Sequence, residues 1–561
     1  MSMERPLALR CPLRGSRLIE ASAGTGKTFT ISALYLRLVI GHGGVDGFVR
    51  PLLPPEILVV TFTDAATQEL RDRIRARLVQ AAKAFRGELE DPDPILSGLL
   101  QDMDPEQHAA CAHRLEIAGQ WMDQAAVSTI HSWCQRMLRE HAFDSGSLFE
   151  QTLETDQSEL LAEVVRDYWR THCYPLQGSA LDWVNSHWGH PDELARRVRV
   201  WLDTAGSPVE QDLQALLASR LEQAQQQLAQ IREPWADWLD ELQTFLAQAC
   251  EAGSFNGNKL KPTIYEPRIQ QLRAWCEGRG TLDFKKGEQF KRFTHEGLQD
   301  ACRKGVQLEL PAGVCAALDA MATLEQRLAQ LPDPAQDALE HAAWWIGRRL
   351  EQEKQRRAQM GFDDMLSRLD TALQGANGPR LAEVIRQQFP VAMIDEFQDT
   401  DPLQYRIFDS IYRVGLNDPD SALLLIGDPK QAIYSFRGAD IHTYLRARDA
   451  THDRHENLDT NFRSSQQMVS AVNGVFRLAE EQWSEGAFRF RDGHGNPLPF
   501  LPVHARGRRE IWTCEGRPGA ALTVWHRSGE RVSSEDYRQD MAQRCASVMV
   551  ALLRGGQAGH T

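Results

Sequence analysis

Residues 17–40 constrain the fold more than any other stretch, because a strand, a tight turn and a helix follow one another directly there. A short apolar run leads into a glycine-rich turn at residues 24–26, and Lys27 and Thr28 open an apolar helix. Glycines let successive backbone N–H groups converge on phosphate oxygens, and the N-terminus of the helix adds partial positive charge. The stretch therefore predicts a phosphate-binding loop made of Ala21, Ser22, Ala23, Gly24, Thr25, Gly26, Lys27 and Thr28.

Within this loop, Lys27 has the position from which a lysine reaches β- and γ-phosphates, and the Thr28 hydroxyl can ligate Mg²⁺. Ala21 departs from the usual pattern G-x-x-x-x-G-K-[ST], in which the first position is glycine. Alanine is small enough to keep the turn. The competing interpretation is a glycine-rich strand–helix turn with an incidental lysine, but the glycines, the Lys-Thr pair and both flanking elements agree on the phosphate loop.

Composition sets looser limits on the function. The chain has 561 residues, enough for about three to four domains, and its net charge of −14 argues weakly against a nucleic-acid partner. Contacts to phosphates depend on a local basic face, so the total charge does not exclude DNA. The ten cysteines form no C-x-x-C pair, which indicates neither a zinc ribbon nor a disulfide framework. Without a secretion signal or about 18 uninterrupted apolar residues, we expect a cytoplasmic protein with reduced thiols and no membrane span.

A second apolar run at residues 57–60 is typical of a buried parallel strand, and it ends in Thr61, Phe62 and Thr63. Ligands bind at this end of strands in open α/β sheets. Hydroxyl groups there can hold a DNA backbone, and Phe62 can support a base. These residues alone leave open a purely structural role, with Phe62 in the core. His131 follows another short strand, and a single histidine at such a place is more often a structural residue.

Two carboxylates follow the apolar run at residues 391–394. In a chain with a phosphate loop, Asp395 can hold the Mg²⁺ shell while Glu396 polarises the attacking water. Burying adjacent carboxylates without a cation is costly, which favours the metal site over a solvated acidic turn.

A third apolar run at residues 422–426 leads into the sequence GDPKQAIYSFRG. Gln431 can sense a γ-phosphate by hydrogen bonding, and Tyr434 and Phe436 can stack on bases at roughly 1–3 kcal/mol each. Arg463, about 25 residues later, can act as an arginine finger on charge in the transition state.

Residues 150–350 have almost no strand-like runs, and apolar side chains recur there at helical spacing. They predict a helical insertion whose tryptophans are mostly packing residues. Two basic stretches, 256–261 and 284–293, stand out, and the second interleaves lysine and arginine with phenylalanine. That interleaving suits a nucleic-acid surface and a solvated helix face about equally.

Six motifs occur in order along the chain: ASAGTGKT, VVTFTDAATQELRDRI, TIHSWCQRML, AMIDEFQDT, LLIGDPKQAIYSFRGAD and NFRSS. Together they resemble superfamily-1 helicases of the UvrD type. Longer stretches, LIEASAGTGKTFTISALYLRL, GFDDMLSRLD and FPVAMIDEFQDTDPLQYRIF, closely resemble the RecB family, the β subunits of exodeoxyribonuclease V, with AddA proteins as a sister family. The resemblance covers about residues 7–550, and it argues against an unrelated P-loop switch ATPase.

The resemblance implies a 3′→5′ DNA motor that uses ATP and Mg²⁺, acts on single-stranded DNA and duplex ends, and works with RecC-like and RecD-like subunits in double-strand-break repair and recombination. By position it makes Gln431 and Arg463 γ-phosphate sensors and Phe462 the aromatic residue that stacks on adenine. It also implies that Phe62, His131, Tyr434 and Phe436 contact single-stranded DNA. The Lys27–Thr28 and Asp395–Glu396 pairs keep the roles given above.

The predicted fold is α/β: a RecA-like P-loop parallel sheet with a large all-helical insertion and an incomplete second RecA-like lobe. We expect lobe 1A at residues 1–140 and 351–455, the insertion at 141–350 and the start of lobe 2A at 456–561. Family members continue into the rest of that lobe and a nuclease domain, so we expect a truncated product or an N-terminal fragment with poor burial after about residue 455. The alternative to a motor is a fragment that binds nucleotide, DNA or RecC without turnover.

Overall fold

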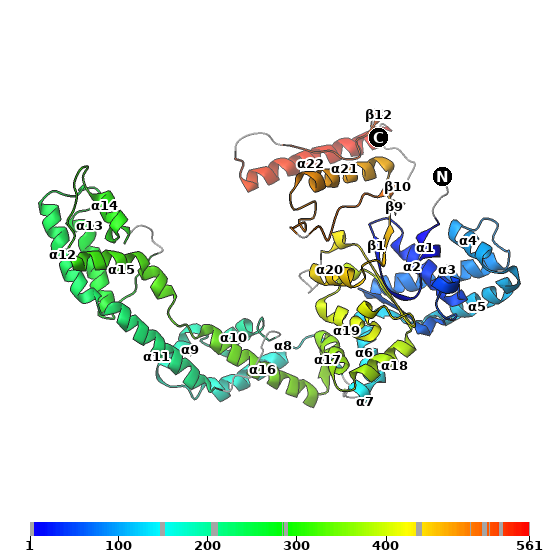
Figure 1. The fold of residues 1–561 in the computed structure, drawn as a ribbon, viewed down its shortest axis with the longest axis horizontal. Coiled ribbons are helices and arrows are strands. Elements are labelled where there is room, and N and C mark those ends of the chain that lie inside the picture. The colour runs from blue at the N-terminus through cyan, green and yellow to red at the C-terminus, as the bar shows by residue number, and fades with distance from the viewer. Residues whose placement is uncertain are drawn as a thin grey trace. The chain divides into compact units, whose positions relative to one another are not determined.

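The computed structural model describes residues 5–145, 152–202, 211–282, 284, 290–433, 440–493, 495–507, 513–514, 517–526 and 531–559. It divides into two compact units (Figure 1). Met1–Leu153 with Met360–Thr561 forms the sheet unit, and Glu154–Gln359 forms the helical unit. Among the described residues, no helix has the length and apolar character needed to cross a membrane.

The sheet unit contains a six-stranded sheet whose neighbouring strands are all parallel. In spatial order the strands are β3 (Val127–Thr129), β2 (Ile57–Thr61), β6 (Val391–Ile394), β7 (Ala422–Gly427), β1 (Gly15–Ala21) and β8 (His455–Leu458). The three apolar runs predicted as strands are β2, β6 and β7, and every residue of these strands is buried. The prediction of an α/β fold with a parallel sheet is confirmed. β8 crosses the predicted boundary at residue 455 and pairs with β1.

Helices cover both faces of this sheet. Successive strand residues point to opposite faces, so a strand such as β2 contributes side chains to two hydrophobic cores. Ile57 and Val59 belong to one hydrophobic core, and Leu58 and Val60 belong to the other. The first core includes side chains from α1 (Leu7–Arg10), α2 (Lys27–Ile40), α3 (Asp64–Phe85), α4 (Pro94–Asp102) and α5 (His108–Gln120). The second includes side chains from α6 (Ile130–Glu140), α17 (Phe362–Gln374), α18 (Gly378–Gln388), α19 (Pro402–Tyr412) and α20 (Ile441–Ala450). α7 (Ala142–Ser145) follows α6 in the chain.

The helical unit has two hydrophobic cores of its own. Its helices are α8 (Ser158–Tyr168), α9 (Gly178–His187), α10 (Pro191–Val198), α11 (Leu213–Arg232), α12 (Trp235–Glu251), α13 (Pro262–Cys276), α14 (His295–Ala301), α15 (Ala312–Ala329) and α16 (Ala335–Arg356). The short strands β4 (Thr152–Leu153) and β5 (Gln359–Met360) lie where the chain passes between the units. Tryptophans at positions 169, 183, 188, 235 and 275 are buried, as packing residues are.

The basic stretch at 284–293 differs from a nucleic-acid surface in its aromatic residues. Phe290 and Phe293 are 5% and 2% exposed and belong to a core of the helical unit. Lys259 and Arg292 both form ion pairs with Asp300. Phe290 and Phe293 therefore offer no stacking face to a base. Lys285 and Lys286 lie outside the described residues.

Few side chains are buried after residue 460. The described elements there are β9 (Thr460–Asn461), α21 (Gln466–Gln482), β10 (His504–Ala505), β11 (Thr513–Cys514), β12 (Arg517–Pro518) and α22 (Ser534–Gln557). β9 pairs with β10, and β11 pairs with β12. Asn461, Val469 and Leu498 are the buried side chains among the described residues of this part. Burial is poor here, in line with the expectation, and the assignment to a second lobe stays a prediction.

Candidate functional site

The predicted phosphate loop connects β1 to α2. Gly24 and Gly26 have φ angles of 79° and 87°, in the left-handed region that favours glycine. A Cβ atom on Gly24 would lie 2.8 Å from the Cβ of Arg463 and 2.9 Å from Nδ2 of Asn461. Gly24 is therefore required both by its backbone conformation and by the close approach of residues 461–464, which we call the NFRS segment.

Hydrogen bonds hold the NFRS segment against the loop. The side-chain amide of Asn461 donates to the carbonyl of Ala23 at 2.8 Å, and the N–H of Phe462 donates to the carbonyl of Gly24 at 2.8 Å. The other side of the Asn461 amide accepts from the N–H of Arg463 at 3.0 Å. These bonds place the exposed side chains of Phe462 and Arg463 directly beside the phosphate loop.

The end of β6 brings the predicted acidic pair to the same place. The ammonium group of Lys27 forms an ion pair with Oε2 of Glu396. Glu396 has a φ of 53°, which is uncommon for a residue with a side chain and marks sites where structure enforces a strained conformation. Its N–H donates to Oδ1 of Asp395 at 2.9 Å, and the N–H of Asp395 donates to the carbonyl of Val60 in β2 at 2.9 Å. Strand pairing thus fixes both acids opposite Lys27.

Burial raises the pKa values of Asp395 and Asp399. Burial and the charge of Glu396 raise the pKa of Asp395 to about 6, although Lys27 lowers it. The pKa of Asp399 is raised to about 6 for the same two reasons, against the same lysine. Oδ1 of Asp399 is buried without a hydrogen-bond partner. Additional positive charge at this place would favour the ionised carboxylates.

The side chains fit Mg²⁺ by their chemistry. A threonine hydroxyl at residue 28 and a carboxylate at Asp395 are the hard oxygen donors that Mg²⁺ prefers. In the described part of the chain, no three histidine, cysteine or acidic side chains are grouped as a metal site. Mg²⁺ in nucleotide sites takes only one or two protein carboxylates and completes its shell with phosphates and water.

Gln431 lies in the turn after β7, in the short helix η9 (Pro429–Gln431). Its side-chain amide donates to Oδ2 of Asp428 at 2.7 Å. Asp428 is 1% exposed and also pairs with Lys430 at 2.8 Å. Because β7 lies between β6 and β1, this turn ends beside both the acidic pair and the phosphate loop. Tyr434 and Phe436, in the same motif, lie outside the described residues.

The structure thus gathers most of the predicted nucleotide residues at the carboxyl ends of β1, β6 and β7. We call this group the phosphate-loop site: Lys27, Asp395, Glu396, Gln398, Asp399, Asp428 and Gln431. Sequence reasoning missed Gln398, Asp399, Asp428 and Asn461. All four residues belong to motifs that resemble the helicase motifs, so the sequence did contain a signal for them. The roles predicted from those motifs went to neighbouring residues such as Glu396, Gln431 and Arg463.

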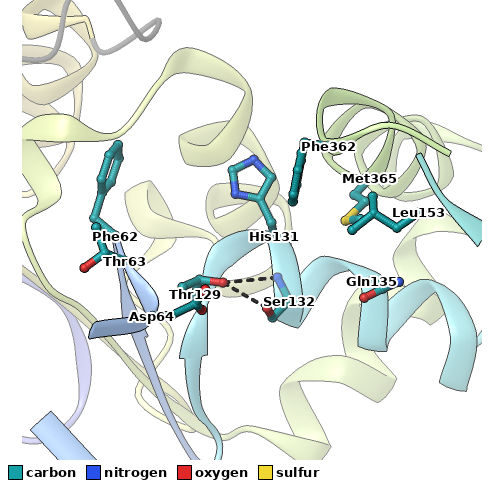
Figure 2. Close-up of a pocket in the computed structure, with 10 residues that line it drawn as sticks. All are labelled: Phe62, Thr63, Asp64, Thr129, His131, Ser132, Gln135, Leu153, Phe362 and Met365. Atoms are coloured by element: carbon teal, nitrogen blue, oxygen red, sulfur yellow. Dashed lines mark hydrogen bonds between the residues drawn. The ribbon is translucent and has the colours of Figure 1, made fainter. Parts of the chain in front are cut away.

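A separate cavity of about 280 Å³ lies at the carboxyl ends of β2 and β3 (Figure 2). We call it the His131 cavity; it is lined by Phe62, Thr63, Asp64, Thr129, His131, Ser132, Gln135, Leu153, Phe362 and Met365. The rings of His131 and Phe362 meet edge to face, with centroids 5.6 Å apart. Burial lowers the pKa of His131, despite the opposing charges of Asp363 and Asp401. Its imidazole is therefore neutral at pH 7, and the cavity is aromatic rather than cationic.

Thr61 is where the structure differs from the prediction of DNA contacts. Its side chain is 3% exposed, and its hydroxyl lies 2.5 Å from the hydroxyl of Thr67 in α3. Thr61 therefore faces the protein interior and does not offer a donor to a DNA backbone. Thr63 lines the cavity and caps α3 by accepting the N–H of Ala66 at 3.2 Å. Sequence reasoning missed Phe362, although its stretch was part of the resemblance.

Comparison with known proteins identifies the family of the chain. Residues 1–452 match the UvrD/REP helicase N-terminal domain. The "RecBCD enzyme subunit RecB" of Escherichia coli K12 is 42% identical over 558 residues, which is 98% of this chain and 45% of that protein. The proteins of the same name from Haemophilus influenzae and Mycobacterium tuberculosis H37Rv are 34% and 27% identical, over 95% and 96% of this chain and 45% and 36% of theirs. The chain spans less than half the length of these relatives. It belongs to the UvrD/REP helicase family, and its resemblance to RecB is confirmed.

Proposed function

We propose that this chain carries the ATP-hydrolysing part of a RecBCD-type helicase–nuclease subunit. ATP hydrolysis with Mg²⁺ would drive 3′→5′ movement along single-stranded DNA during double-strand-break repair and recombination. The single observation that carries the proposal is the meeting of three strand ends around Lys27, which pairs with Glu396. The helicase family and the RecB relatives support it.

In this proposal the backbone N–H groups at residues 24–26 and Lys27 hold the phosphates of ATP. Thr28 and Asp395 would hold Mg²⁺, which would supply positive charge at this site. Lys27 forms an ion pair with Glu396. A phosphate that takes over Lys27 frees the Glu396 carboxylate to accept a hydrogen bond from the attacking water and then its proton, which is the role of a general base.

The proposal assigns the His131 cavity to single-stranded DNA. Phe62, His131 and Phe362 line it, and aromatic faces stack on bases without sequence preference. RecC-like and RecD-like subunits are proposed partners, because the relatives are named as subunits of a RecBCD enzyme. A duplex DNA end is the proposed substrate of that assembly.

The alternative is a chain that binds nucleotide, DNA or a RecC-like subunit without turnover. It is favoured by the exposed side chain of Arg463, since an arginine finger must be held on the transferring phosphate to act. The scarcity of buried side chains after residue 460 points the same way.

ATP hydrolysis measured with and without single-stranded DNA separates the two. We expect DNA-stimulated turnover by this chain and its loss in the variant Lys27→Ala, with Lys83→Ala as a matched control on the exposed surface of α3. Binding of nucleotide without any turnover would support the alternative. Turnover that survives in Lys27→Ala would contradict the role given to Lys27.

A further inference from the structure

Gln398 is a buried glutamine that joins the ends of two neighbouring strands. Its side chain is 2% exposed and follows β6 in the short helix η7 (Phe397–Asp399). Its Nε2 donates to Oε2 of Glu396 at 2.8 Å and to Oδ2 of Asp399 at 3.2 Å. Its Oε1 accepts the backbone N–H of Asp428, after β7, at 2.9 Å. One amide group therefore links the acidic turn to the turn that carries Gln431.

The network permits only one orientation of this amide. Turning it over would place its NH₂ group against the N–H of Asp428 and its oxygen against two carboxylates. Gly427 provides the space, because a Cβ atom there would lie 2.7 Å from Oε1 of Gln398 and 3.1 Å from its backbone nitrogen. A larger residue at position 427, the last of β7, would therefore collide with the amide of Gln398.

The connection continues to Gln431. Oδ2 of Asp428 accepts from the side-chain amide of Gln431 at 2.7 Å, and its Oδ1 accepts the N–H of Lys430 at 3.1 Å. A continuous hydrogen-bonded path therefore runs from Glu396 through Gln398 and Asp428 to Gln431. Buried hydrogen bonds to ionised groups are strong and directional, so the path can hold its two ends in a fixed relation.

We infer that Gln398 is a positioning residue that couples the Glu396 carboxylate to the Asp428–Gln431 turn. This inference rests on the proposed function for the roles of Glu396 and Gln431. Oε2 of Glu396 accepts from both Lys27 and Gln398. When phosphate takes Lys27, the amide of Gln398 is the described partner that keeps Glu396 in place. A movement of Gln431 on the γ-phosphate is then transmitted to the carboxylate that polarises water.

Two substitutions separate the two halves of this link. Gln398→Glu keeps an oxygen that accepts the N–H of Asp428 but replaces the donor to Glu396 by a carboxyl group. Gln398→Met removes the acceptor and the donor together. Gln404→Met is the matched control, because Gln404 is also a buried glutamine, 7% exposed, on the following helix α19.

Amide hydrogen exchange of the nucleotide-free chain tests the link without any catalysis. We expect faster exchange in the peptide covering residues 427–432 for Gln398→Met, and wild-type exchange for Gln398→Glu and Gln404→Met. Wild-type exchange in Gln398→Met would overturn the inference.

Steady-state hydrolysis with saturating single-stranded DNA tests the coupling. We expect Gln398→Met to lower kcat about tenfold or more while KM for ATP stays within about twofold. For Gln398→Glu, the ratio of variant to wild-type kcat should be higher at about pH 6 than at about pH 8, because a protonated carboxyl donates as the amide does. A ratio of one at both pH values would overturn the inference. A wild-type chain without turnover would instead refute the proposed function, and the exchange measurement would still decide whether the link exists.

Discussion

The same edge of one parallel sheet carries two groups of side chains with opposite chemistry. At the ends of β1, β6 and β7, the phosphate-loop site is built from a lysine, four acids and two glutamines joined by hydrogen bonds. At the ends of β2 and β3, the His131 cavity is lined by the rings of Phe62 and Phe362, a neutral imidazole, two further apolar side chains and five polar or acidic ones. The sheet determines only where strand ends meet, and the residues after each strand determine what can bind there.

The two sites also differ in how they are stabilised without a ligand. Buried carboxylates with raised pKa values store an unfavourable electrostatic energy that positive charge can relieve. At the His131 cavity, the expected gain on binding single-stranded DNA comes from stacking and burial of apolar surface on Phe62 and Phe362. Substitutions at the two sites should therefore separate catalysis from DNA affinity.

The largest effect is expected for Glu396→Gln at the phosphate-loop site. The variant keeps the size of the side chain but loses the charge that polarises water in the proposed function, so kcat should fall roughly 10²–10⁴-fold. Affinity for nucleotide and for single-stranded DNA should stay close to the wild-type values. Steady-state hydrolysis and equilibrium binding measure the three quantities, with Glu69→Gln on the exposed surface of α3 as the control. A loss of DNA affinity as large as the loss of kcat would show that Glu396 also affects DNA binding, and that the two sites do not act separately.

The next largest effect is expected for Phe62→Ala in the His131 cavity. Loss of one stacking face costs roughly 1–3 kcal/mol, which is about 5- to 150-fold in affinity for single-stranded DNA. Fluorescence anisotropy of a labelled oligonucleotide at fixed salt measures the change, and nucleotide affinity should be unaffected. Phe143→Ala, an exposed aromatic residue outside the cavity, is the control. Equal affinities of Phe62→Ala and wild type for single-stranded DNA would show that DNA does not stack on Phe62 in this cavity.

Much of this arrangement could be predicted from local sequence. Apolar runs such as 391–394 identified buried strands, and functional residues were expected where those strands end. The meeting of Lys27 with Glu396 follows from that rule. The strand order could not be predicted, because β6 and β7 enter the sheet between β2 and β1 after more than 200 intervening residues. Such pairings depend on tertiary packing.

The residues for which the sequence left the role open, or suggested none, are those whose surroundings come from other elements. Phe62 and Phe293 look alike as aromatic residues in polar stretches, but Phe62 lines a cavity and Phe293 is 2% exposed in a helical core. Gln398 accepts the N–H of Asp428 just after Glu396, whose backbone is in the left-handed conformation. No spacing rule in the sequence predicts that conformation.

A smaller effect, on stability rather than on DNA affinity, is expected for Thr61, the last residue of β2. Thr61→Val preserves shape but removes the buried hydroxyl contact with Thr67, which should lower the free energy of unfolding by about 0.5–1.5 kcal/mol. DNA affinity should not change, because the hydroxyl faces the interior. Chemical denaturation and oligonucleotide binding measure the two quantities. A weakened affinity for DNA with unchanged stability would restore Thr61 as a DNA contact.

The smallest effect concerns the charge stored at the phosphate-loop site. The pKa of Asp399 is raised from 3.8 to about 6 in the folded chain, so the folded state holds this proton more tightly than the unfolded state. Stability from the protonated form is complete below about pH 4 and is lost as the pH rises through about 6. Asp399→Asn keeps an oxygen for the amide of Gln398 and cannot ionise. It should therefore melt higher than the wild type at about pH 7.

We expect this difference to be about 2–4 °C at pH 7, without nucleotide or divalent cations, to become smaller as the pH falls through about 6, and to vanish only below about pH 4. Differential scanning fluorimetry measures it, with Asp72→Asn on the exposed surface of α3 as a control that should show no pH-dependent difference. Added Mg²⁺ and nucleotide should raise the wild-type melting temperature more at pH 7 than at pH 5, because ionised carboxylates then gain a counter-charge. If Asp399→Asn melts lower than the wild type at pH 7, the ionised carboxylate of Asp399 stabilises the folded chain, and the expectation that it is destabilising without added positive charge is wrong.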